Sequence, residues 1–177
     1  MNTPVDVDAL VRRFAAALVR LRARPLDEAE VWRVREAYAL FVGDWAVDGW
    51  TCDPGGARRA VVGTLRCGFS GDGAWLLARY QEVATAVNVR PSVATDHWGI
   101  ADGELVRFGF GAAGSGFFGT ATGWSAGGLV WEGAWYGAGR RVRACDVVRR
   151  DAGGLWISGF VDEEHVAELR LTRCQAG

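Results

Sequence analysis

The spacing of apolar residues near the start of the chain is that of an amphipathic helix. Leu10, Phe14, Leu18 and Leu21 recur at intervals of three or four residues, so they share one helical face. The helix is expected to end just before Pro25, because proline disfavours a helical conformation in the residue that precedes it.

A second helix is predicted directly after this proline. Asp27 can cap its first turn, and Glu30 three residues later completes a capping box. Gly43 is expected to end the helix, whose buried stripe consists of Val31, Val34, Tyr38 and Phe41. Residues 1–42 are therefore expected to form a two-helix extension packed on the rest of the chain, as a lid, a plug or a dimer contact.

At Gly43 the period of the pattern changes from 3.6 to 2, which predicts β-strands for the remainder of the chain. The connections are short and rich in Gly and Asp, as in hairpin turns, so neighbouring strands are expected to be antiparallel. Closure into a barrel removes both exposed sheet edges. We predict a mainly β protein, an up-and-down antiparallel barrel of eight to ten strands over residues 43–177, with a β-sandwich as the alternative. The predicted strands lie near 44–50, 58–69, 74–83, 93–100, 104–111, 116–123, 129–137, 140–149, 155–161 and 164–173.

Tryptophan is unusually frequent in the β region. Inward tryptophans would line a cavity for a planar or aromatic ligand, because aromatic rings stack on one another. The alternative is that they fill the core of the barrel. Polar side chains on the same strands would orient such a ligand. The candidates for ligand contact are Trp75, Arg79, Trp98, Arg107, Phe110, Trp124, Trp131, Trp135 and Tyr136.

Which face of one strand points into the barrel decides whether a carboxyl group is available there for catalysis. Trp131 and Trp135 share one face of this strand, and Glu132 and Tyr136 share the other, because side chains alternate across a strand. An inward Glu132 would be a carboxyl removed from water, a kind of residue that is common at functional sites. An inward Trp131 would leave Glu132 in water. The sequence does not decide which of the two faces points inward.

Three further side chains are candidates for acid–base work. His97 can serve as a general acid or base, with a hydrogen-bonded wall histidine as the alternative. Tyr80 and Glu82 share one face of the third strand, and Arg79 lies on the other. Whichever face points inward therefore carries polar groups into the barrel, unless this end of the strand lies in water. If the protein is an enzyme, its candidate catalytic residues are Tyr80, Glu82, His97 and Glu132.

Composition narrows the classes of function. The 177 residues carry a formal net charge of −1 and include no lysine, so nothing in the overall charge attracts nucleic acid or an anionic membrane. The four cysteines form no C-x-x-C pair, which predicts free thiols rather than a metal site. No segment has the roughly 20 apolar residues of a membrane span, and the first residues are unlike a signal peptide. We therefore expect a cytoplasmic protein without a metal or cofactor.

Both ends of the β region resemble a known family. Gly43-Asp44-Trp45 opens the first strand as a Gly-x-Trp signature does in lipocalins and other calycins, and Arg173 ends the last strand where such barrels often place an arginine against that tryptophan. Residues 40–173 are similar to lipocalin-like β-barrels of uncharacterised bacterial proteins. The disulfides and second signature of lipocalins are absent, and some forty helical residues precede the barrel. The resemblance implies the fold and the binding of small apolar molecules.

Three hypotheses of function follow. The first is binding of a small, mainly apolar or aromatic molecule in the barrel interior. The second is a barrel enzyme of the cyclase or isomerase type, which would act on a hydrophobic natural-product-like substrate by shape and one acid–base residue. The third is an interaction protein that forms a homodimer through its N-terminal helices, with a barrel filled by its own tryptophans.

Overall fold

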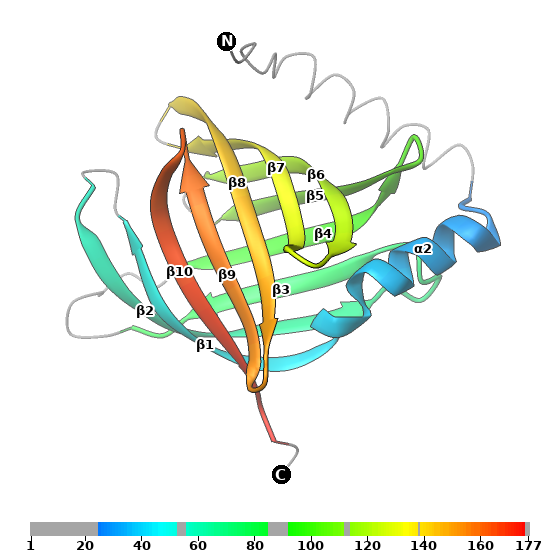
Figure 1. Cartoon of the computed structure of the whole chain (residues 1–177), viewed down its shortest axis with the longest axis horizontal. Helices are drawn as coiled ribbons and strands as arrows, with labels where there is room; N and C mark the ends of the chain where they lie inside the picture. Colours follow the sequence, from blue (N-terminus) through cyan, green and yellow to red (C-terminus); the bar gives the residue numbers. More distant parts are fainter. Residues whose placement is uncertain (1–24, 53–55, 85–91, 112–113, 138, 176–177) are drawn as a thin grey trace.

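Ten antiparallel strands close into one barrel in which each strand pairs with its neighbours in sequence and β1 pairs with β10 (Figure 1). The computed structural model describes residues 25–52, 56–84, 92–111, 114–137 and 139–175. The prediction of a mainly β, up-and-down antiparallel barrel is confirmed. The strands are β1 (Gly43–Cys52), β2 (Arg58–Phe69), β3 (Leu76–Glu82), β4 (Val93–Ala101), β5 (Glu104–Gly111), β6 (Gly116–Ser125), β7 (Gly128–Gly137), β8 (Arg140–Asp151), β9 (Gly154–Val161) and β10 (Glu164–Arg173).

The second predicted helix is present as α2 (Glu28–Tyr38), followed by the 3-10 turn η1 (Ala39–Phe41). The capping box forms as expected: the Asp27 carboxylate accepts from the Glu30 amide at 2.9 Å, and the Glu30 carboxylate accepts from the Asp27 amide at 3.0 Å. The α-helix ends at Tyr38, earlier than Gly43. The first predicted helix lies outside the described residues.

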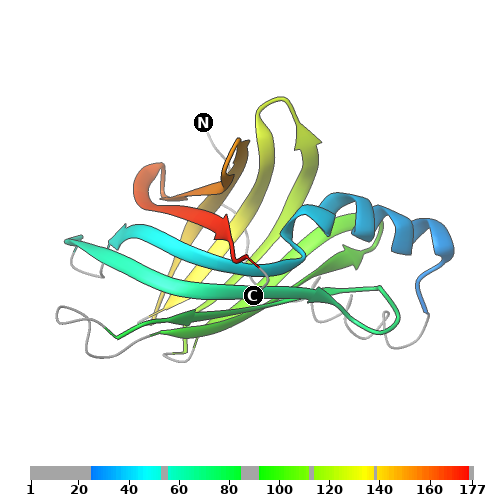
Figure 2. The same cartoon turned by 90° about the horizontal axis from the view of Figure 1, so that it is seen from below.

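One end of the barrel is closed by the end of α2 and by η1 (Figure 2). Three side chains of the barrel bind the carbonyl groups there. The indole N–H groups of Trp45 and Trp124 donate to the carbonyls of Phe41 and Ala37, each at 2.7 Å. The guanidinium of Arg173 donates to two further carbonyls of this turn and lies 4.4 Å above the Trp45 ring. The Trp–Arg pair expected of a lipocalin-like barrel thus holds the helical segment, and the architecture is compatible with that fold.

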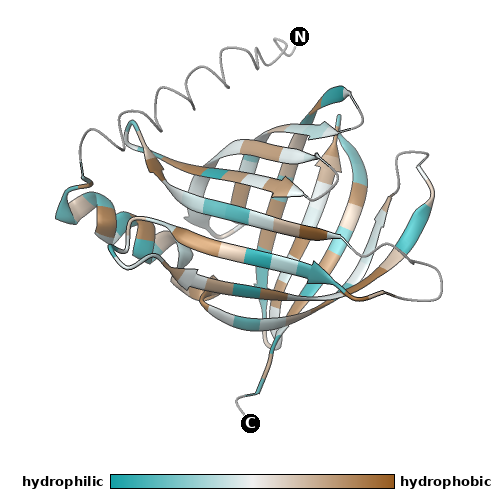
Figure 3. Cartoon of the chain, turned by 180° about the vertical axis from the view of Figure 1, so that it is seen from behind, coloured by the Kyte–Doolittle hydropathy of each residue, from teal (hydrophilic) through white to brown (hydrophobic). Residues whose placement is uncertain are grey.

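Hydrophobic and polar residues are interspersed along the strands, as Figure 3 shows by colour, and buried and exposed positions alternate most clearly on β2 and β3. On β2, for example, Val61, Gly63, Leu65 and Cys67 are buried, and the residues that alternate with them are exposed. Inward residues are therefore identified by their register partners around the barrel. No helix in the described part of the chain is long and apolar enough to cross a membrane.

Candidate functional site

The two faces of β7 are distinct. Trp131 is fully buried, Trp135 on the same face is half-buried, and Glu132 is exposed. Trp131 and Trp135 are register partners of Asp146 and Val142 on the inward face of β8. The tryptophan face therefore points inward, and Glu132 lies in water on the outer wall.

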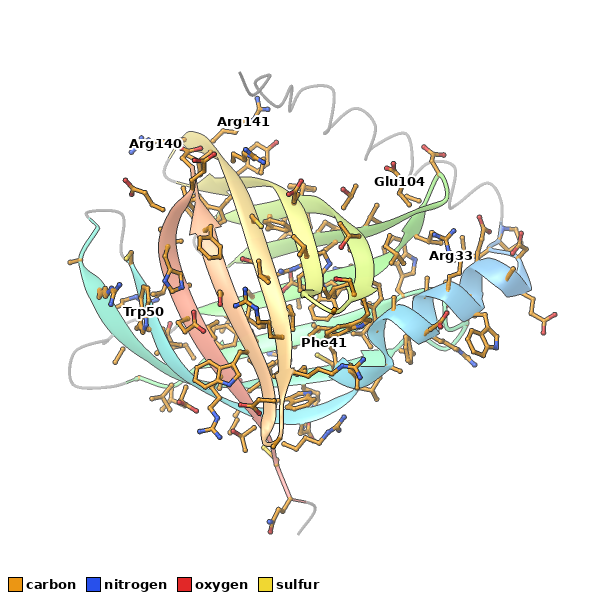
Figure 4. All side chains as sticks on the ribbon, viewed as in Figure 1. Arg33, Phe41, Trp50, Glu104, Arg140 and Arg141 are labelled. Carbon is orange, nitrogen blue, oxygen red and sulfur yellow. The ribbon has the colours of Figure 1, made fainter. Side chains whose placement is uncertain are left out.

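Side chains fill the half of the interior next to α2. The Phe41 ring, labelled in Figure 4 at the barrel end of α2, lies 4.6 Å from Trp98 and 5.7 Å from Trp131, centroid to centroid. Tyr38 lies 5.6 Å from Trp98 on the same measure. Buried inward side chains surround these rings: Trp45, Leu65, Leu129, Val148, Leu155 and Leu171. In this half the tryptophans belong to the core, as expected if they fill the barrel rather than line a ligand cavity.

The half away from α2 is different, because several of its inward apolar and aromatic side chains are only half-buried, although Val61 and Glu82 in this half are buried. A side chain that points into a closed barrel and still contacts solvent borders solvent-accessible space at the open end of that barrel. We call this space the lumen. Its wall is apolar and aromatic, and consists of Tyr80, Trp135, Val142, Val161, Ala167 and Leu169.

A charged triad separates the packed half from the lumen. Arg107 of β5 pairs with Asp96 of β4 through Nε to Oδ1 at 3.2 Å, and its Nη1 donates to Oδ2 of Asp146 on β8 at 2.6 Å. The three side chains are 15, 13 and 23 % exposed for Arg107, Asp96 and Asp146. Strands β5 and β8 are not neighbours, so the Arg107–Asp146 pair spans the interior.

Two glycines make room for the two carboxylates. Gly109 is the register partner of Asp96, and a Cβ atom at Gly109 would lie 1.9 Å from the Asp96 Oδ1 atom. Gly159 is the register partner of Asp146, and a Cβ atom there would lie 3.2 Å from the Asp146 Oδ1 atom. Each carboxylate therefore lies over a residue without a side chain, which allows it to remain inside the barrel wall.

Aromatic rings surround the guanidinium. The Arg107 Cζ atom lies 4.8 Å from the ring centre of Trp131, 4.9 Å from that of Phe117 and 5.6 Å from that of Trp98. Burial by itself lowers the pKa of Arg107, but the charges of Asp96 and Asp146 outweigh burial, and the net shift is upward. Arg107 is therefore a permanent cation and not a source of protons.

A second ion pair lies at the end of the lumen away from α2. The Glu82 side chain is 1 % exposed and pairs with Arg59, and it also accepts from the Ser92 amide at 3.0 Å. Burial raises the pKa of Glu82, but the Arg59 and Ser92 hydrogen bonds outweigh burial and lower it overall. Burial, aided by the Glu82 charge, raises the pKa of Tyr80. At neutral pH this end thus presents a carboxylate that is already paired and a neutral phenol.

One cysteine near the triad is not activated. Cys67 points inward on β2, and burial, aided by the charge of Asp96, raises the pKa of its thiol to about 12. It therefore remains a thiol at neutral pH and is a poor nucleophile.

Several buried polar atoms have no hydrogen-bond partner among the described residues. The indole N–H groups of Trp98 and Trp131 and the hydroxyl of Tyr38 are enclosed beside Arg107 on its packed side. Burial raises the pKa of the Tyr38 phenol, and the nearby indole of Trp131 opposes this rise. The two groups do not form a hydrogen bond.

The structure divides the predicted site residues between two surfaces. Of the predicted ligand contacts, Trp98, Arg107, Trp124, Trp131 and Trp135 point inward, whereas Trp75, Arg79, Phe110 and Tyr136 lie on the outer wall and do not line the lumen. Of the predicted catalytic residues, Tyr80 and Glu82 point inward, and His97 and Glu132 point outward. The four predicted catalytic groups are therefore not brought together.

His97 and Arg79 border an open groove of about 620 Å³ on the outer faces of β1 to β4. The His97 ring stacks on Phe108 on the outer wall, with the ring centroids 4.7 Å apart. Its Nδ1 atom is buried without a hydrogen-bond partner.

Sequence reasoning missed the two aspartates and their glycines. Asp96 precedes His97 and Asp146 lies between Cys145 and Val147, and neither aspartate belongs to a recognisable motif. A usable signal was present: each aspartate lies on an otherwise apolar or small inward face, opposite a glycine on the next strand.

No group of three or more His, Cys, Asp or Glu side chains in the described ranges is placed to hold a metal ion. No protein-family model matches the chain, and no curated protein matches its sequence. Fold and site alone therefore define its class. It is a closed ten-stranded up-and-down barrel that is packed at the end next to α2 and carries half-buried apolar and aromatic inward side chains toward the other end.

Proposed function

We propose that the protein binds a small, mainly apolar or aromatic molecule in the lumen. The half-buried state of the inward side chains away from α2 carries this proposal. When a ligand covers apolar and aromatic side chains that were in contact with water, binding is stabilised by about 25 cal/mol per Å² of apolar surface buried. The resemblance to lipocalin-like barrels, which hold small apolar molecules, supports the same conclusion.

The barrel-enzyme alternative has less support. Glu82 is held by Arg59 and Ser92, and no second acid–base group of the predicted set lies beside it except the neutral phenol of Tyr80. The geometry favours binding without turnover.

The test is a fluorescence titration with N-phenyl-1-naphthylamine, an apolar aromatic probe that is uncharged at neutral pH. We expect saturable binding of one probe per chain to the wild type. Val142→Trp places a large ring in the lumen beside Trp135 and should abolish binding.

The matched control is Val147→Trp, which adds the same ring to the outward face of the same strand. It should bind the probe as the wild type does. The thermal midpoint of both variants shows that they are folded. Absence of saturable binding by the wild type, or unchanged binding by Val142→Trp, contradicts the proposal.

A further inference from the structure

We propose that the molecule bound in the lumen is an amine, and that its protonated nitrogen contacts the carboxylate of Asp146 at the base of the lumen. This inference rests on the proposed function, because the same space must first accept the apolar body of the ligand. The inference specifies, beyond the proposed function, the charge of the ligand and its orientation in the lumen.

The charge balance of the triad is the first observation. One guanidinium faces two carboxylates, so with both carboxylates ionised the triad carries a net charge of −1. The ion pair of Arg59 with Glu82 balances itself and supplies no compensating charge. Uncompensated charge inside a protein is unfavourable, and a ligand cation at this point would neutralise it.

The two carboxylates differ in their free hydrogen-bonding capacity. Asp96 uses both oxygens on Arg107, with Nε to Oδ1 at 3.2 Å and Nη2 to Oδ2 at 3.5 Å. Asp146 uses only Oδ2, and within the described ranges no donor reaches its Oδ1 atom. A carboxylate oxygen accepts hydrogen bonds strongly, so the spare oxygen of Asp146 is the acceptor that a ligand ammonium would find.

The buried hydrogen-bond donors of the packed half indicate from which side a ligand can reach the Oδ1 atom of Asp146. The indole N–H groups of Trp98 and Trp131 and the Tyr38 hydroxyl are all without a partner, so none of them reaches Asp146. They belong to the packed half. Asp146 is also the more exposed of the two carboxylates. Its spare oxygen is therefore accessible from the lumen and not from the packed half.

The length of the lumen wall suggests where the rest of the ligand lies. Asp146 is paired with Trp131, and Trp135 lies four residues farther along the same ladder, roughly 13 Å at the usual rise of a strand. A ligand with an aromatic ring toward Trp135 and a short aminoalkyl chain toward Asp146 fits this arrangement. Aromatic faces beside a carboxylate also favour an ammonium group through cation–π attraction.

The experiment is a competition of three probes of similar shape against N-phenyl-1-naphthylamine: phenethylamine, which is cationic, propylbenzene, which is neutral, and 3-phenylpropionate, which is anionic. We expect phenethylamine to bind at least about tenfold more tightly than propylbenzene, because a hydrogen bond to a charged group adds that much. The anion should bind more weakly than the neutral probe.

Two matched variants locate the effect. Asp146→Asn should weaken phenethylamine about tenfold and change propylbenzene little. Asp48→Asn, an exposed aspartate on the outward face of β1, should leave all three affinities unchanged. Asp96→Asn also brings the net charge of the triad to zero and should reduce the advantage of the amine, which covers the case that Asp146→Asn does not fold.

The outcomes separate the two proposals. If N-phenyl-1-naphthylamine does not bind, or binds regardless of Val142→Trp, the proposed function fails and this inference fails with it. If that probe binds in the lumen but the amine has no advantage, or the anion binds best, only this inference is overturned. The ranking in the wild type decides this without any variant.

Discussion

At the scale of single residues, the interior is organised around Arg107. Its guanidinium is stacked among aromatic rings and holds two carboxylates from strands on different sides of the barrel. Such a buried ion group adds little stability by comparison with apolar residues, but removal of one member is costly because it leaves charge without a partner.

Replacement of Arg107 by methionine should lower the free energy of unfolding by about 3 kcal/mol, since Asp96 and Asp146 would then be buried together without a cation. Chemical denaturation measures the change. The control is Arg66→Met, which breaks an Arg–Asp pair of similar length on the surface, with side chains that are 80 and 54 % exposed. That variant should unfold close to the wild-type midpoint. Equal losses in the two variants would refute the role of Arg107.

Alanine at Gly109 should also disturb the triad, because its Cβ atom would lie 1.9 Å from the Asp96 carboxylate. We expect a loss of about 2 kcal/mol in the free energy of unfolding. In an Asp96→Ala background the same substitution should cost little, and this coupling is the diagnostic result. Gly68→Ala is the control, since no heavy atom lies within 4 Å of the added carbon. A loss at Gly109 that is independent of Asp96 would show that the glycine serves another purpose.

The pair of Glu82 with Arg59 predicts a dependence of stability on pH. A carboxyl whose pKa is lowered on folding contributes stability above its ordinary value of 4.5, and that contribution is lost as the pH falls through the lowered value. The difference in free energy of unfolding between the wild type and Glu82→Gln should therefore be largest near neutral pH and shrink below pH 4.5. Glu36→Gln on the exposed face of α2 is the control. A difference that stays constant down to low pH would contradict the assigned shift.

At the scale of elements, α2 and η1 act as a plug. Phe41 and Tyr38 fill the end of the barrel, and Trp45, Trp124 and Arg173 bind the carbonyl groups of the same turn. The helix therefore belongs to the core of the barrel at this end, although only a short part of it contacts the strands.

Truncation of the plug should be among the most damaging single changes. Phe41→Ala removes a fully buried ring and should cost about 3–5 kcal/mol in the free energy of unfolding. Trp32→Ala removes a larger ring from the same helical segment, but that ring is 64 % exposed and its loss should change stability little. The thermal midpoints of the two variants provide the comparison. A greater loss at Trp32 would show that the helix is held by its other face.

The elements were predictable because their signals are local. A period of two, Gly- and Asp-rich turns and the Asp27–Glu30 capping box each act over a few residues, and the corresponding strands and α2 are present. The inward face of β7 was not decided, because both of its faces carry large side chains. Ala134 on the outer face is as buried as an interior residue, so the pattern of that strand is ambiguous.

The triad was beyond prediction for a different reason. Arg107 and Asp146 are 39 residues apart, on strands that are not neighbours, so only the closure of the barrel brings them together. Arg107 was predicted as a ligand contact, whereas the structure shows it between two carboxylates on the floor of the lumen. Contacts across a barrel depend on its diameter and stagger, which no single strand encodes.

At the scale of the whole molecule, the barrel combines a packed core with an open end that is lined by half-buried apolar and aromatic side chains. The packed half, plugged by α2, provides the stability that a closed sheet needs, and the triad marks its boundary. The lumen beyond it has an apolar wall and an acidic floor. This division places Trp45, Trp98 and Trp131 in the core and leaves Trp135 half-buried toward the open end.

The most direct test of this account is a crystal structure of the protein with phenethylamine at saturating concentration. The account predicts one molecule inside the barrel, with its ring on the Trp135 side of the lumen and its nitrogen within hydrogen-bond distance of Asp146 Oδ1. A molecule bound inside the barrel but turned away from Asp146 would leave the lumen in place and refute the amine contact. A lumen filled by the side chains of the protein itself, with the probe absent or bound only on the outer wall, would contradict the central claim.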